Sequence, residues 1–173
     1  YLGRFFFYAL SITGEIISVS MGLSSAQLFN PNIDGHSSVT NQFLITVATL
    51  FFLAIEGHHL FLTALQQSFH LVPLSHHLIS LGQFENFGQI VQAIMIIGVK
   101  MSAPVLMAVL FMNLVMAVIG RAVPQINVLI TSLPVNILIG FLVMIVSLPL
   151  VLVQMNGLLE LTALHIFKLL KTF

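Results

Sequence analysis

The sequence predicts an all-α, multi-pass membrane protein with kinked helices, and three observations carry this prediction. Hydrophobic residues make up 58% of the 173 residues, and the mean hydropathy is +1.10. Charged residues make up only 6%, whereas soluble domains carry roughly 25%. Long apolar segments follow one another along the chain. Because so few charges cannot cover the surface of a globule in water, the composition argues against a water-soluble monomer.

Four segments have the length of a membrane-spanning helix, which needs about 20 apolar residues. They are Phe5–Leu23, Phe43–Leu65, Phe87–Ile119 and Val128–Val153. The first contains Gly14 and Glu15, and the second contains Glu56 and Gly57. The sequence starts at Tyr1 and not at Met, so we expect it to be part of a longer chain that lacks its N-terminal portion here.

The third and fourth segments predict a long antiparallel helical hairpin over residues 87–153. A short polar connection with Gly120 and Pro124 separates them, and its length suits two antiparallel helices. Pro104, Pro134 and Pro149 fall inside the two segments. Proline inside an apolar helix is tolerated where neighbouring protein or water satisfies the freed carbonyl groups, so we expect these kinked helices to pack against other helices.

The last stretch, Asn156–Phe173, has a different pattern, with polar residues every three to five positions between leucines. This pattern predicts an amphipathic helix for a membrane interface or a partner groove.

Residues 24–42 form the longest polar stretch, which we call the central loop. It carries two turn signals, Asn30-Pro31 and Asp34-Gly35. Loops of this length in compact domains are usually functional or disordered. Two interpretations stay open at this point, a plain connector and a plug that lies across a pore.

Three charged residues fall within apolar surroundings, namely Glu15, Glu56 and Lys100. Ionisable groups at membrane depth are costly and mark a function or a specific partner. Glu15 and Lys100 either reach the headgroups or pair with a neighbouring subunit, or they line a water-filled path.

Several function classes are disfavoured. The chain has no cysteine, which excludes disulfides and thiolate sites, and its five cations are scattered, so nucleic-acid binding is not expected. No nucleophile-elbow, zincin, P-loop or dinucleotide motif occurs, and we expect neither enzyme activity nor a cofactor. His58 and His59 lie in one Glu-x-x-His unit, but a di-iron site needs two such units, and we therefore expect no metal.

Several short motifs together resemble the FliR family of type III export-gate subunits (FliR/SctT-like). The motifs, in order and at compatible spacing over nearly the whole chain, are Gly14–Ala26 with Asn30-Pro31, Gly57-His58-His59, Ser68-Phe69 with Pro73, Ala103-Pro104, Asn113-Leu114, Arg121–Val128 and Pro134. On this resemblance, residues 1–173 are identified as a single export-gate domain.

The resemblance implies a subunit of the flagellar protein export gate in the bacterial inner membrane, at the basal body. Its partners would be FliP-like, FliQ-like and FlhB-like subunits, membrane lipid and the unfolded flagellar proteins that pass through the gate, which has no active site. The central loop would help to plug the pore, and the hairpin tip would face the cytosol. The implied pore residues are Gly22, Leu28, Phe29, Asn30, Pro31 and Asp34. The implied packing residues are Gly57, His58, His59, Phe69, Pro73, Pro104, Asn113, Arg121, Pro124, Gln125, Asn127 and Pro134.

Two other function classes remain as alternatives. A secondary transporter with broken helices would use Glu15 and Lys100 as coupling groups, although no internal repeat is visible. A membrane-embedded metalloenzyme would use the histidines.

Overall fold

The computed structural model describes residues 4–24, 39–71, 83–125 and 127–172, and every element in these ranges is an α-helix. The helices are α1 (Arg4–Met21), α3 (Val39–Ala54), α4 (Gly57–Leu71), α5 (Gln83–Ala122) and α6 (Val128–Thr172). The prediction of an all-α fold is confirmed.

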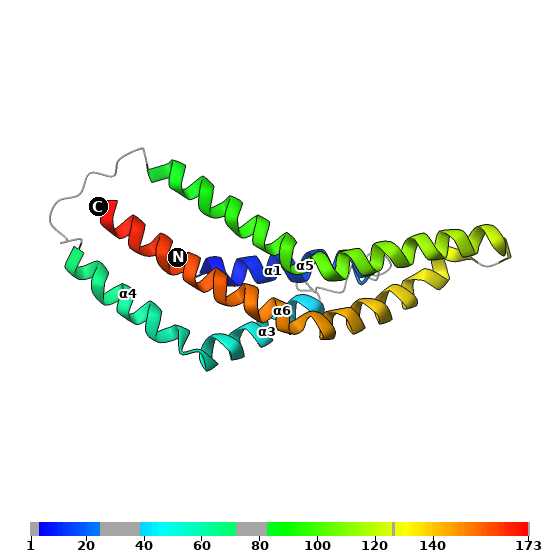
Figure 1. The fold of residues 1–173 in the computed structure, drawn as a ribbon, viewed down its shortest axis with the longest axis horizontal. Helices are drawn as coiled ribbons and strands as arrows, with labels where there is room; N and C mark the ends of the chain where they lie inside the picture. The colour runs from blue at the N-terminus through cyan, green and yellow to red at the C-terminus, as the bar shows by residue number, and fades with distance from the viewer. Residues whose placement is uncertain (1–3, 25–38, 72–82, 126, 173) are drawn as a thin grey trace, which may run out of the picture.

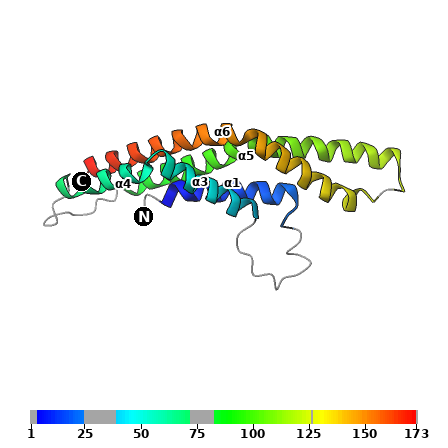
Figure 2. The same ribbon diagram turned by 90° about the horizontal axis from the view of Figure 1, so that it is seen from below.

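The longest helices, α5 and α6, have 40 and 45 residues and run antiparallel as the predicted hairpin (Figure 1). Figures 1 and 2 show that α1 and α3 pack along one half of this hairpin, whereas the half with the connection extends beyond them. The molecule is therefore elongated, with a thicker bundled half and a thinner two-helix half.

The hydrophobic core lies where α1 packs against α3, α5 and α6. One cluster of buried side chains, at the start of α1, comprises Phe6, Ala9, Leu10, Ala48, Ile94, Ile97, Met101, Val151, Met155, Leu158 and Leu159. A second cluster, at the end of α1, comprises Ile17, Met21, Leu44, Val105, Val109 and Met144. Because both clusters draw on residues far apart in the sequence, α1 holds the bundled half together.

Two of the four predicted spans are helices long and apolar enough to cross a membrane, namely Val91–Ala122 in α5 and Ile130–Leu159 in α6. The apolar part of α1, Phe6–Met21, is shorter than a span. The predicted segment 43–65 is not one helix, because the chain bends by 76° between α3 and α4. Together these two helices form at most a third, broken span.

The helix predicted from Asn156 onward is the last part of α6, which runs unbroken from Val128 to Thr172. Gly157 costs about 1 kcal/mol in a helix interior relative to alanine. Met155, Leu158 and Leu159 on either side of it are buried in the first core cluster. The burial of these three side chains outweighs the cost of one glycine, so the helix continues.

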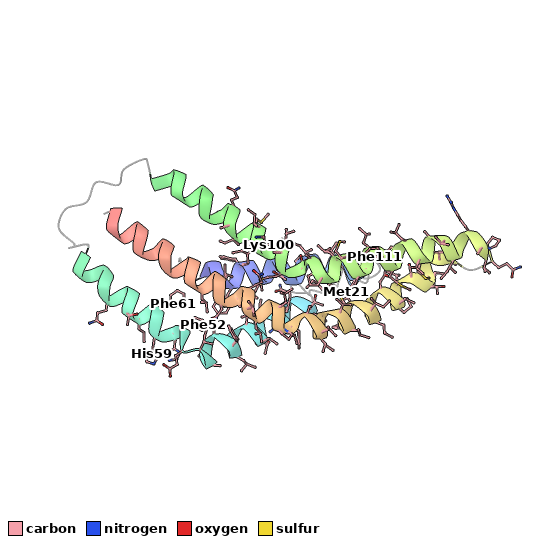
Figure 3. The ribbon with its side chains drawn as sticks, in the orientation of Figure 1. Met21, Phe52, His59, Phe61, Lys100 and Phe111 are labelled. Carbon is pink, nitrogen blue, oxygen red and sulfur yellow. The ribbon has the colours of Figure 1, made fainter. Side chains whose placement is uncertain are left out.

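The prolines inside α5 and α6 do not end these helices. Pro104 lies inside α5, and Pro134 and Pro149 lie inside α6. In Figures 1 and 3, α5 changes direction between Lys100 and Phe111, where Pro104 lies. A proline removes one backbone hydrogen bond and its ring crowds the preceding turn, which accounts for the bend.

Candidate functional site

The end of α1 is fixed by a glycine cap at the start of the central loop. Gly22 has a φ of 81°, a left-handed conformation that glycine adopts without steric cost. Its amide donates to Val19 O at 3.1 Å, and the Leu23 amide donates to Ser18 O at 3.0 Å. These two bonds form a Schellman motif, the usual way to end a helix at glycine. The structure therefore gives Gly22, a predicted pore residue, a helix-capping position.

The other end of the central loop is fastened to α1 by the first turn of α3. The Thr40 hydroxyl donates to Gly14 O at 3.0 Å, and the Asn41 side-chain amide donates to the Ser11 hydroxyl at 3.1 Å. A Cβ on Gly14 would lie 2.5 Å from the Asn41 Cα, so the two helices touch through their backbones. Small residues permit such close helix approach.

The opposite side of α1 makes a similar close contact with α5. The Thr13 hydroxyl lies 2.8 Å from Ala9 O and 3.2 Å from Gly98 O. A Cβ on Gly98 would lie 3.0 Å from a methyl group of Ile12. Thr13 and Gly14 thus place α1 between α3 and α5. The remaining predicted pore residues, Leu28, Phe29, Asn30, Pro31 and Asp34, lie outside the described residues.

The bend between α3 and α4 is built on Glu56 and Gly57. Glu56 has a φ of 56°, which is uncommon for a residue other than glycine. A Cβ on Gly57 would lie 2.5 Å from the Phe52 ring. The rings of Phe52 and Phe61, one from each helix, have centroids 5.6 Å apart, and Figure 3 shows them on the inner side of the bend. Gly57 therefore permits the aromatic contact that closes the angle.

The two predicted histidines start α4. The rings of His58 and His59 have centroids 4.4 Å apart, and the His59 amide donates to Glu56 O at 2.9 Å. No group of three or more His, Cys, Asp or Glu side chains that could hold a metal ion occurs in the described part of the chain. His58 Nδ1 is buried without a hydrogen-bond partner among the described residues. Phe69 belongs to α4, and Pro73 lies outside the described residues.

A polar contact joins α5 and α6 in the extended half of the hairpin. The Asn136 side-chain amide of α6 donates to the Asn113 side-chain carbonyl oxygen of α5 at 2.8 Å. Asn136 Oδ1 is buried and has no partner among the described residues. Sequence reasoning identified Asn113 but missed Asn136, whose only sequence signal is an amide inside an apolar segment.

The connection of the hairpin is exposed and capped. Arg121, Pro124 and Gln125 are exposed at the tip of the hairpin. Asn127 accepts three bonds at the start of α6. Its backbone oxygen accepts from the Thr131 amide and the Thr131 hydroxyl, each at 3.1 Å, and its side-chain oxygen accepts from the Ile130 amide at 3.4 Å. Asparagine is a preferred N-cap, so Asn127 sets where α6 begins, and Pro134 follows on an exposed position.

A comparison with protein families identifies the chain. The model of the family "Bacterial export proteins, family 1" matches residues 1–162. The chain belongs to this family. As an export protein with two helices apolar enough to span a bilayer, it is a membrane protein.

The chain is similar in sequence to several flagellar proteins. The chain is 32% identical to flagellar biosynthetic protein FliR of Bacillus subtilis over 158 residues, which cover 89% of this chain and 61% of the relative. It is 33% identical to FliR of Aquifex aeolicus over 154 residues, covering 89% and 59%. It is 26% identical to FliR of Escherichia coli over 148 residues, covering 86% and 57%. The chain thus spans about three fifths of the length of these relatives.

Within this family member, the described residues bring together helix–helix contacts and not a set of reactive groups. Glu15, Glu56 and Lys100 are all exposed, and they lie on α1, the α3–α4 bend and α5. No ion pair joins Lys100 to either carboxylate. The arrangement is suited to positioning helices against neighbouring helices.

Proposed function

We propose that the chain is a subunit of the flagellar protein export gate, where it lines and seals the channel that unfolded flagellar proteins cross. Membership in the bacterial export proteins and the similarity to FliR proteins support this proposal. The subunit would act in the bacterial inner membrane at the flagellar basal body, by forming part of a conduit and without a reaction or cofactor of its own.

One observation carries the proposal, namely the exposed apolar surface of the hairpin. Large apolar side chains are exposed on both helices of the hairpin, including Leu110, Phe111, Leu114, Val115, Val118, Ile130, Leu138, Leu142, Ile145 and Val146. Exposed apolar patches of this extent mark protein or membrane contacts. The same helices contain prolines and an asparagine pair. Helices with such groups are better accommodated against other helices than against lipid alone.

The partners that fit this surface are other helical subunits of the gate. We propose FliP-like, FliQ-like and FlhB-like subunits as these partners, with lipid around the outside of the assembly. The exposed connection at Arg121–Asn127 would face the cytosol. The alternative of a secondary transporter gains no support from the fold or from the family match.

The central loop is proposed to contribute to the plug. Its far end is fastened to the interior of α1, where Thr40 and Asn41 contact Gly14, and its near end follows the Gly22 cap at the end of α1. A loop held on α1 at both of its ends would lie across a channel formed with the partner subunits.

The test is assembly of the full-length protein with its partners. The protein is expressed with the FliP-like, FliQ-like and FlhB-like subunits of the same bacterium, extracted in detergent and purified through a tag on this chain. We expect the three partners to co-purify at fixed ratios. A tagged chain that is purified folded but carries none of them would contradict the proposal.

The same complex tests the plug. Deletion of residues 27–35 should increase ion conductance through the gate in planar bilayers, because it shortens the proposed plug and leaves its anchors in place. The matched control is Gly88→Ala, a change at an exposed helical position with no atom nearby, which should leave conductance unchanged. An equally tight gate after the deletion would show that the loop is a connector.

A further inference from the structure

One face of α5 is an exposed apolar stripe that contains a single charge. Its members recur at the spacing of one helix face and are all exposed: Ile96, Lys100, Met107, Phe111, Leu114 and Val118. The buried residues of α5, such as Met101, Val105 and Val109, lie on the opposite face against α1 and α6. The stripe is thus a surface that the chain itself does not cover.

Among the residues whose side chains the structure describes, Lys100 has no anionic partner. It is nine positions inside the apolar segment Val91–Ala122, and neither Glu15 nor Glu56, the acidic residues with described side chains, pairs with it. A lysine in the middle of an apolar helix is costly to insert into a membrane. Charges in such places are paired with an opposite charge or line a path for ions.

A second polar group accompanies the ammonium group. Pro104 follows Lys100 by four residues and has no amide hydrogen, so the Lys100 carbonyl oxygen loses its usual helical donor. The bend of α5 lies here (Figure 3). The same turn therefore presents a cation and a backbone acceptor. Lipid tails satisfy neither group, whereas a neighbouring helix with polar side chains can satisfy both.

We propose that this stripe is the docking surface for an apolar helix of another export-gate subunit, and that this helix places a carboxylate against Lys100 Nζ. Charge complementarity supports this choice of partner. The Lys100 ammonium group lies in an apolar face, so the matching surface is an apolar helix face that carries one carboxylate. Met107, Phe111 and Leu114 supply the apolar contacts, and the ion pair fixes the register between the helices. The inference rests on the proposed function, since it places a gate subunit on α5.

The experiment is charge reversal in the full-length protein expressed with its gate partners. Lys100→Glu should lower the recovery of the partner subunits at least about tenfold, because a tenfold change needs only about 1.4 kcal/mol. Lys100→Arg should keep the recovery within about twofold of the parent. The control is Gln66→Glu, which adds a negative charge at an exposed position of α4, away from the stripe, and should leave assembly unchanged.

A second arm identifies the carboxylate. Each acidic residue within the apolar helices of the partner subunits is changed to lysine, and one of these changes should restore assembly with Lys100→Glu. Restoration also shows that the variant folds. The inference is overturned if Lys100→Glu assembles as well as Gln66→Glu, or if no acidic-to-lysine change restores assembly. A parent protein that fails to co-purify with any partner would instead overturn the proposed function.

Discussion

Gly14 shows at the scale of one residue how a missing side chain determines the packing of two helices. A Cβ at this position would lie 2.5 Å from the Asn41 Cα, which is backbone and cannot rotate away. In the sequence, Gly14 interrupts an apolar segment and begins one of the family motifs, and neither observation shows what it contacts. Its meaning depends on Thr40 and Asn41, which are more than 20 positions away and give no local signal of contact.

The first prediction concerns this contact. Gly14→Ala should lower the free energy of unfolding of the full-length protein by about 1–3 kcal/mol, the usual cost of overpacking, because α1 and α3 must move apart. Gly88→Ala should raise it by about 0.5–1 kcal/mol, since alanine is the better helix former and nothing lies near that position. Thermal unfolding in detergent, followed by circular dichroism, compares the two variants. Equal effects would contradict the close contact.

Glu56 illustrates a residue whose backbone, and not its charge, matters for the fold. Its φ of 56° places it in the left-handed region, which costs a non-glycine residue roughly 1–2 kcal/mol. Glu56→Gly should therefore raise the free energy of unfolding by up to about 1 kcal/mol. Glu15→Gly, the same change inside α1, should lower it by about 0.5–1 kcal/mol. Unfolding curves of both variants show whether the free energy of unfolding rises or falls. A lower free energy of unfolding for both variants would argue against the left-handed conformation of Glu56.

At the scale of elements, the hairpin was the most predictable part of the fold. The polar connection with Gly120 and Pro124 lies between two long apolar segments, and both signals are local. The α3–α4 bend was less predictable, because Glu56 is not a residue type that marks a turn and the closing contact between Phe52 and Phe61 is tertiary. The continuity of α6 past Gly157 was also missed, because it depends on the burial of Leu158 and Leu159.

The hairpin carries a prediction of its own at Asn113 and Asn136. Asn113→Leu should lower the free energy of unfolding by about 1–3 kcal/mol, because the Asn136 amide then lacks its acceptor. Replacing both asparagines by leucine should recover most of this loss, since no buried polar group remains. A double-mutant cycle by thermal unfolding measures the coupling, expected at about 1 kcal/mol. Additive effects of the two changes would mean that the bond at 2.8 Å contributes no stability.

At the scale of the whole molecule, the two halves of the chain differ in how far their helices cover one another. The bundled half has its own core around α1, and the composition alone indicated that the rest would need a covering. What the composition could not show is where the boundary lies, because that depends on how far α1 and α3 reach along the hairpin (Figure 2). The predicted pore residues beyond Gly22 fall outside the described residues, and their role stays a prediction.

The thin, two-helix end of the molecule has a consequence for the living cell. Apolar surface of this kind on a newly made, solitary copy is what chaperones and proteases of the envelope recognise. Copies covered by the proposed gate partners would then persist, whereas surplus copies would be degraded. The supply of these proposed partners would therefore limit the amount of this protein.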